Sequence, residues 1–118
     1  MMLFERKQYL QQLVSAENNR MIKIVTGIRR CGKSFLLFNI YKKHLLDRGV
    51  SADHIIEINL EDRRNKNLRD PDALLAYIDS RMKDSEKYFI LLDEIQLVPE
   101  FEDVLNSYLH IENAEVYV

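Results

Sequence analysis

The chain alternates between short apolar runs and stretches in which apolar residues recur every three to four positions. The first pattern is typical of strands buried in a sheet, and the second of amphipathic helices. Because strands alternate with helices, the sequence predicts an α/β fold, with a parallel sheet covered by helices on both faces. Strands are predicted at residues 21–26, 54–60, 88–92 and 114–118. Helices are predicted at about 4–16, from Lys33 to Gly49, from Asp70 to Met82, and after Pro99 as far as Leu109.

Local signals define the ends of several of these elements. Gly49 is expected to cap the helix that begins at Lys33. Asp70 has the side chain of an N-cap, and a proline at the next position suits the first turn of a helix. The continuous apolar run at 88–92 predicts a central strand, whereas the alternation of apolar and polar residues at 54–60 predicts an edge strand.

Composition and charge exclude several classes of protein. The chain has 118 residues, enough for one domain, and 47% of them are hydrophobic. Its 17 basic and 19 acidic side chains give a net charge of −2, so no overall positive field favours nucleic acid. The single cysteine excludes an internal disulfide, and no apolar run approaches the roughly 20 residues of a membrane span. The charged start does not fit a secretory signal, so we expect a cytoplasmic protein without membrane contact.

Residues 27–34 fit the pattern G-x-x-x-x-G-K-[ST] and lie between a predicted strand and a predicted helix. Such a loop binds nucleotide phosphates, because its glycines let backbone N–H groups approach the ligand and the helix N-terminus adds partial positive charge. Lys33 is expected to reach the β- and γ-phosphates and to act in catalysis, and the Ser34 hydroxyl to ligate Mg²⁺. The residues expected to bind the nucleotide are Gly27, Ile28, Arg29, Arg30, Cys31, Gly32, Lys33, Ser34 and Phe35.

Two carboxylates follow the predicted central strand. The carboxyl ends of parallel strands face the ligand crevice, so Asp93 and Glu94 should face the phosphate loop. Asp93 is expected to hold Mg²⁺ through water, and Glu94 to orient and activate the attacking water. The alternative is a pair of solvated acids at a strand end, which the phosphate loop makes the weaker interpretation. Gln96 either positions a phosphate or water, or belongs to the turn that starts the next helix.

The same region separates ATPases from GTPases. GTPases need a D-x-x-G turn after this strand, and residues 93–96 contain no glycine. They also need an N-K-x-D motif, but residues 65–68 end in Leu68 where that motif requires Asp. Small-molecule kinases usually lack an acidic residue directly after the metal-binding Asp. Phosphoryl transfer from ATP to water is therefore the favoured reaction.

A basic segment between the second predicted strand and the following helix suggests a further contact. Acidic residues flank it, so a solvated loop of mixed charge is the favoured interpretation, and a nucleic-acid contact is the alternative. The basic residues are Arg63, Arg64, Lys66 and Arg69, and the acidic ones are Glu61, Asp62, Asp70 and Asp72.

The stretches 24–34 and 91–96 resemble the prokaryotic AAA-superfamily ATPases, P-loop proteins whose ATPase domain is often followed by a domain of unknown function. Residues 58–62 and the leading amphipathic helix are similar to theirs as well. The resemblance implies a three-layer P-loop NTPase fold with sheet order 5-1-4-3-2, and ATP with Mg²⁺ as cofactors. It implies the same roles for Lys33, Ser34, Asp93 and Glu94.

The family continues beyond its fourth strand into a sensor residue, a fifth strand and a helical lid. Residues 1–118 are therefore expected to form the amino-terminal part of an ATPase domain, with about four strands. We expect ATP hydrolysis from the intact protein and little turnover from these residues alone, with some self-association through the exposed sheet edge. The alternatives are a nucleotide-binding regulatory switch with little hydrolysis, and a DNA-associated ATPase that uses the loop at 61–70.

Overall fold

The computed structural model of the protein describes Ile22 and residues 36–118. The helix expected at 4–16, the phosphate loop and most of the strand expected at 21–26 lie outside the described residues. Ile22 itself is partly buried and packs against the larger of two hydrophobic clusters.

Within the described residues, three parallel strands form one sheet in the order β1-β2-β3. They are β1 (Ile55–Asn59), β2 (Tyr88–Asp93) and β3 (Ala114–Tyr117). All six residues of β2 are buried, as its continuous apolar run predicts, and β1 forms an edge of the described sheet. These strands correspond to the second, third and fourth predicted strands, and their order agrees with that part of the order that the resemblance implies.

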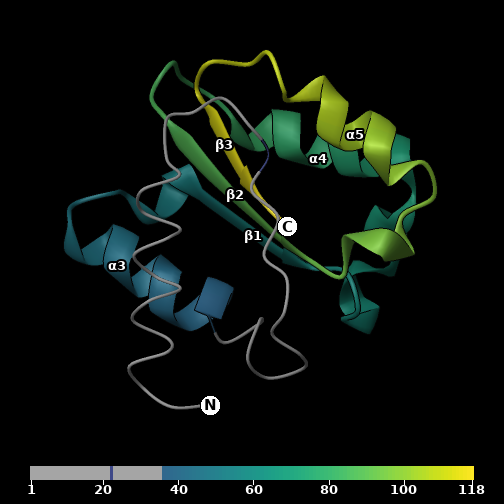
Figure 1. Ribbon diagram of the computed structural model, residues 1–118, viewed down its shortest axis with the longest axis horizontal. Coiled ribbons are helices and arrows are strands. Elements are labelled where there is room, and N and C mark those ends of the chain that lie inside the picture. The colour runs from purple at the N-terminus through teal and green to yellow at the C-terminus, as the bar shows by residue number, and fades with distance from the viewer. Residues whose placement is uncertain (1–21, 23–35) are drawn as a thin grey trace.

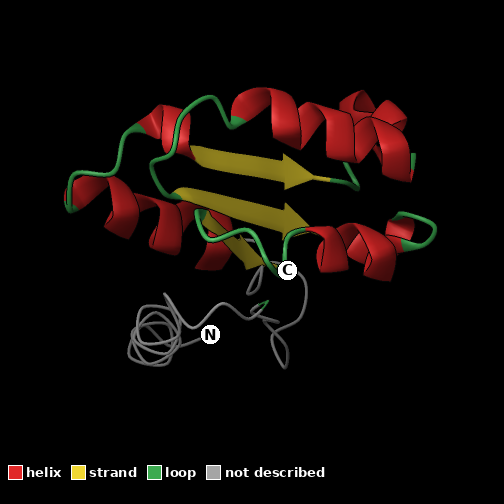
Figure 2. Cartoon of the chain, turned by 90° about the horizontal axis from the view of Figure 1, so that it is seen from above, coloured by secondary structure: helices red, strands yellow, loops and turns green. Residues whose placement is uncertain are grey.

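Helices cover both faces of this sheet (Figure 1), and the view from above separates the layers (Figure 2). The π-helix η1 (Leu36–Tyr41) and helix α3 (Lys42–Asp47) pack on one face, and α4 (Pro71–Arg81) and α5 (Phe101–Ser107) pack on the other. Alternate strand residues serve the two layers: Ile55, Phe89, Leu91 and Tyr117 face η1 and α3, whereas Ile56, Ile58, Tyr88, Ile90, Leu92 and Val116 face α4 and α5. The three-layer α/β prediction is confirmed.

The end of α3 confirms the predicted role of Gly49. Its φ of 100° lies in the left-handed region, where a side chain would be strained. The N–H of Val50 donates to the carbonyl of Leu45 at 3.0 Å, and the N–H of Gly49 donates to the carbonyl of Leu46 at 3.1 Å. This pair of bonds is a Schellman motif, and it turns the chain toward the short 3₁₀ helix η2 (Ala52–His54) and then β1.

The start of α4 also follows from its sequence. The Asp70 carboxylate accepts a hydrogen bond from the N–H of Ala73 at 2.9 Å, and Pro71 occupies the first helical position. One face of the helix then buries Leu74 and Ile78 completely against the sheet. The cap satisfies a backbone donor at the helix start, and the apolar face fixes the helix on the sheet.

The basic segment is more ordered than its composition suggests. Residues Arg63–Arg69 form η3, a 3₁₀ segment that is kinked at Asn65 and whose Leu68 is buried. Arg69 turns back on the strand end: its Nε donates to the carbonyl of Leu60 at 2.8 Å, and its Nη2 to the carbonyl of Glu61 at 3.2 Å. Arg69 therefore holds the chain just after β1 in place.

The last described helix is shorter than its apolar spacing predicts. Helix α5 ends at Ser107, with Tyr108 as its C-cap, and the Leu109 side chain is 37% exposed. Leu109 therefore does not extend the buried face that Val104 and Leu105 form.

Tyr108 joins α5 to α4 through its hydroxyl, which donates to Asp79 Oδ1 at 2.8 Å. Burial and this bond raise the pKa of Tyr108 above its ordinary value of 10.0. Because the protonated form is favoured in the folded state, the bond stabilises the protein fully below pH 10 and this stabilisation is lost as the pH rises further. We expect Tyr108→Phe to lower the free energy of unfolding by about 1 kcal/mol at pH 7, with a smaller difference from the parent above pH 10. Urea denaturation at several pH values measures this, and a difference that does not change with pH would contradict it.

Candidate functional site

Two of the residues predicted to form the site, Asp93 and Glu94, lie in the described part of the chain. The nucleotide-binding residues predicted from Gly27 to Phe35, with Lys33 and Ser34 among them, lie outside it. The site is therefore built from the carboxyl ends of β1 and β2 and from the turn that follows β2.

Asp93 is the last residue of β2, and only 2% of it is exposed. It follows Phe89 and Leu91 on the sheet face that η1 and α3 cover. Its backbone carbonyl accepts a hydrogen bond from the N–H of Leu60 at 3.0 Å, which fixes the end of β2 beside the end of β1. A carboxylate at so buried a position requires hydrogen bonds or a cation to offset the loss of water. The oxygen atoms of a carboxylate are ligands that Mg²⁺ prefers.

The direction of the helical layer shows which end of it lies near Asp93. Tyr41, at the end of η1, donates a hydrogen bond from its hydroxyl to that of Tyr117, the last residue of β3, at 2.7 Å. Arg48, after α3, instead lies over the ring of Phe89, near the start of β2. The helical layer therefore runs antiparallel to the strands, and its first residues lie toward the carboxyl edge of the sheet. Leu36, where η1 begins, is two positions after Ser34.

Glu94 follows in a conformation that is rare for a residue with a side chain. Its φ is 60°, in the left-handed region, and it precedes the 3₁₀ helix η4 (Ile95–Leu97). Its side chain is partly exposed, and its Oε2 accepts a hydrogen bond from Nε2 of Gln96. The buried carboxylate of Asp93 is thus followed directly by the partly exposed carboxylate of Glu94, which lies outside the strand. Strained backbone of this kind clusters at functional sites, although it identifies none by itself.

Asn59, which is not among the predicted site residues, lies at the same edge. It is the register partner of Asp93 on β1, and the N–H of Glu61 donates to its Oδ1 at 3.0 Å. The Asn65 amide donates to the Asn59 carbonyl at 2.9 Å, which ties η3 to the strand end. The sequence feature that could have identified Asn59 is its position as a polar residue at the end of a predicted strand.

An ion pair lies within the basic segment, near this edge. Arg64 Nη2 lies 3.0 Å from Asp62 Oδ2, and the hydrogen bonds from Arg64 hold the pKa of Asp62 below its ordinary value. Arg69 bonds backbone carbonyls, as described above. Residues 65–68 lie within η3 with Leu68 buried, so they do not present a base-reading loop.

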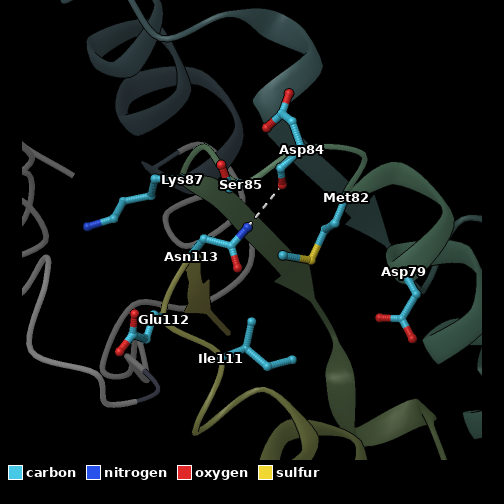
Figure 3. A pocket seen from close by; sticks show the side chains of 8 residues that line it. All are labelled: Asp79, Met82, Asp84, Ser85, Lys87, Ile111, Glu112 and Asn113. Carbon is cyan, nitrogen blue, oxygen red and sulfur yellow. Dashed lines mark hydrogen bonds between the residues drawn. The ribbon is translucent and has the colours of Figure 1, made fainter.

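A hollow of about 760 Å³ lies at the opposite edge of the sheet, where β2 and β3 begin (Figure 3). Asn113 crosses part of it and donates from its amide to the carbonyl of Asp84 at 3.3 Å. The Lys87 side chain points away from the other labelled residues, and its Nζ lies 3.6 Å from Glu115 Oε1. None of the residues predicted to form the site lines this hollow.

Comparison with known proteins supplies the family. A family model described as an AAA domain matches residues 19–118. The chain belongs to this AAA domain family. An uncharacterized protein of Haemophilus influenzae is 31% identical over 117 residues, which cover 98% of this chain and 29% of that protein. This AAA chain thus spans less than a third of the length of that relative, and no solved structure matches it.

Membership confirms the resemblance to AAA-type ATPases and supports nucleotide binding of the ATPase type. The further domain after the ATPase domain stays a prediction. In the part of the AAA chain that the structure describes, no helix is long and apolar enough to cross a membrane.

Proposed function

We propose that this AAA chain binds ATP with Mg²⁺ at the carboxyl edge of its sheet, and that the intact protein hydrolyses the ATP. The observation that carries the proposal is the pair formed by a buried Asp93 and a left-handed Glu94 at the end of the central strand. This pair lies at the edge toward which the start of η1 points. The sequence G-x-x-x-x-G-K-S ends two residues before η1.

We assign the binding of the triphosphate to residues 27–35 because their sequence contains the phosphate-loop pattern. Backbone N–H groups of this loop would donate to the phosphate oxygens, and Lys33 would neutralise charge on the β- and γ-phosphates. Asp93 and the Ser34 hydroxyl offer the oxygen ligands that Mg²⁺ takes beside phosphate, Asp93 acting through a bound water. Magnesium would supply neutralisation of the charge on the phosphate oxygens.

Glu94 is assigned the proton transfer. A water in line with the γ-phosphate must lose a proton as it attacks, and a carboxylate within hydrogen-bond reach accepts that proton. Its partly exposed position next to Asp93 supports this role, because a base must reach the water while the buried neighbour serves the metal. The γ-phosphate then leaves as inorganic phosphate, and ADP remains.

Asp93→Asn tests the proposed site through the magnesium dependence of nucleotide binding. The substitution keeps the size of the side chain and removes its charge. We expect the Mg²⁺ concentration for half-maximal stabilisation by ATP to rise about 10- to 100-fold, as is typical when a residue that holds a metal-bound water is changed. Thermal unfolding in ATP across a magnesium series measures this.

Asp103→Asn is the matched control, because Asp103 lies on the exposed first turn of α5. It should follow the parent curve. If the Asp93 variant follows the parent curve as well, Asp93 does not hold the metal and the proposed site is wrong.

A further inference from the structure

The turn after β2 holds Gln96 in a fixed relation to Glu94. The side chains of Ile95 and Val98 are buried in the core below α4 and α5, so they anchor the turn from within. The N–H of Leu97 donates to the carbonyl of Glu94 at 3.1 Å, and the N–H of Val98 to that of Ile95 at 2.9 Å. The turn is therefore held without any help from the exposed Gln96 side chain.

The Gln96 side chain has a specific partner instead. Its Nε2 donates to Oε2 of Glu94, and no other described side chain bonds either group. This side-chain bond between residues two positions apart is not required for the fold, because backbone bonds and two buried anchors already define η4. What the bond does define is the direction of the Glu94 carboxylate, which the left-handed backbone alone leaves free to rotate.

We propose that Gln96 is a positioning residue for Glu94: its amide fixes the Glu94 carboxylate by one oxygen and leaves Oε1 to accept the proton of the attacking water. This inference rests on the proposed function. A neutral donor orients the carboxylate without placing a second charge beside it. An amide does not titrate, so it supplies this donor over the whole working range of pH.

Gln96→Met and Gln96→Glu in the intact protein test the proposal. Methionine keeps the length of the side chain without a donor, and we expect kcat for ATP hydrolysis to fall about tenfold, as for loss of one hydrogen bond to a charged group. The KM for MgATP should stay unchanged, because Gln96 contacts the Glu94 carboxylate and is not assigned to the nucleotide. Glutamate also places a like charge beside Glu94, so the fall in kcat should be larger than with methionine.

Leu97→Ala serves as a control in the same turn, because Leu97 is exposed and its replacement should leave kcat and KM unchanged. In a Glu94→Gln background, Gln96→Met should cause no further loss, since the group that Gln96 positions no longer accepts a proton. Urea midpoints for each variant identify any loss of fold.

The outcomes separate this inference from the function on which it rests. If Glu94→Gln alone leaves turnover unchanged, the proposed role of Glu94 fails. If Glu94→Gln stops turnover while both Gln96 variants keep the parental kcat, Glu94 is the base and the inference about Gln96 is wrong. A fall in kcat that is the same in the parent and the Glu94→Gln background also overturns it.

Discussion

Replacing Glu94 with Gln is expected to slow ATP hydrolysis by the intact AAA protein by about 10²- to 10⁴-fold, the usual contribution of a general base. The amide has the shape of the carboxylate but does not take a proton from water. Because Glu94 is assigned to the water and not to the phosphates, the dissociation constant for MgATP should stay close to that of the parent. Single-turnover hydrolysis, together with a binding titration, separates the two quantities.

Glu100→Gln is a close control for this experiment. Glu100 is also an exposed glutamate in the left-handed region, with φ of 57°, at the start of α5. It shares the chemistry and the backbone strain of Glu94 but not its place after β2, so its variant should hydrolyse ATP at the parental rate. Parental turnover in the Glu94 variant would remove Glu94 from the mechanism.

Local signals in the sequence predicted a large part of the fold. The start of α4 depends on Asp70 and Pro71, and the end of α3 on Gly49, each of which acts within a few residues. The central place of β2 follows from its unbroken apolar run, because only a strand covered on both faces buries every side chain. The two helix ends depend on residues that are close in sequence, and the place of β2 depends on one apolar run. A single sequence is therefore enough to predict them.

Local signals in the sequence did not predict contacts between residues that are several positions apart. Arg69 bonds carbonyls eight and nine positions earlier, and the composition of its segment gave only a mixed-charge loop. Helix α5 ends before Leu109 although apolar spacing continues to it, because the chain there turns toward β3.

The candidate site likewise contains one feature that the sequence predicted and others that it did not. The place of Asp93 at the carboxyl edge follows from strand topology, which the alternating pattern already indicated. The left-handed conformation of Glu94 and its bond to Gln96 do not, because neither residue type favours that geometry and the bond depends on η4 being anchored by buried side chains.

Loss of nucleotide binding on Lys33→Ala is the second large effect that we expect. Lys33 is assigned the charge that neutralises the β- and γ-phosphates, and no neighbouring backbone donor replaces a full positive charge. At a nucleotide concentration of 100 times the dissociation constant, binding stabilises the parent by about 2.7 kcal/mol, and this stabilisation should disappear in the variant. Lys43→Ala is the control, since Lys43 forms an exposed pair with Asp47 on α3.

Calorimetric titration of MgATP into residues 1–118 and into their Lys33→Ala and Lys43→Ala variants tests whether this chain binds ATP at the loop that contains Lys33. We expect saturable binding at one site in the parent and in the Lys43 variant, and no measurable binding in the Lys33 variant. Equal binding by all three proteins, or no binding by the parent, would contradict the assignment of an ATP site to this chain.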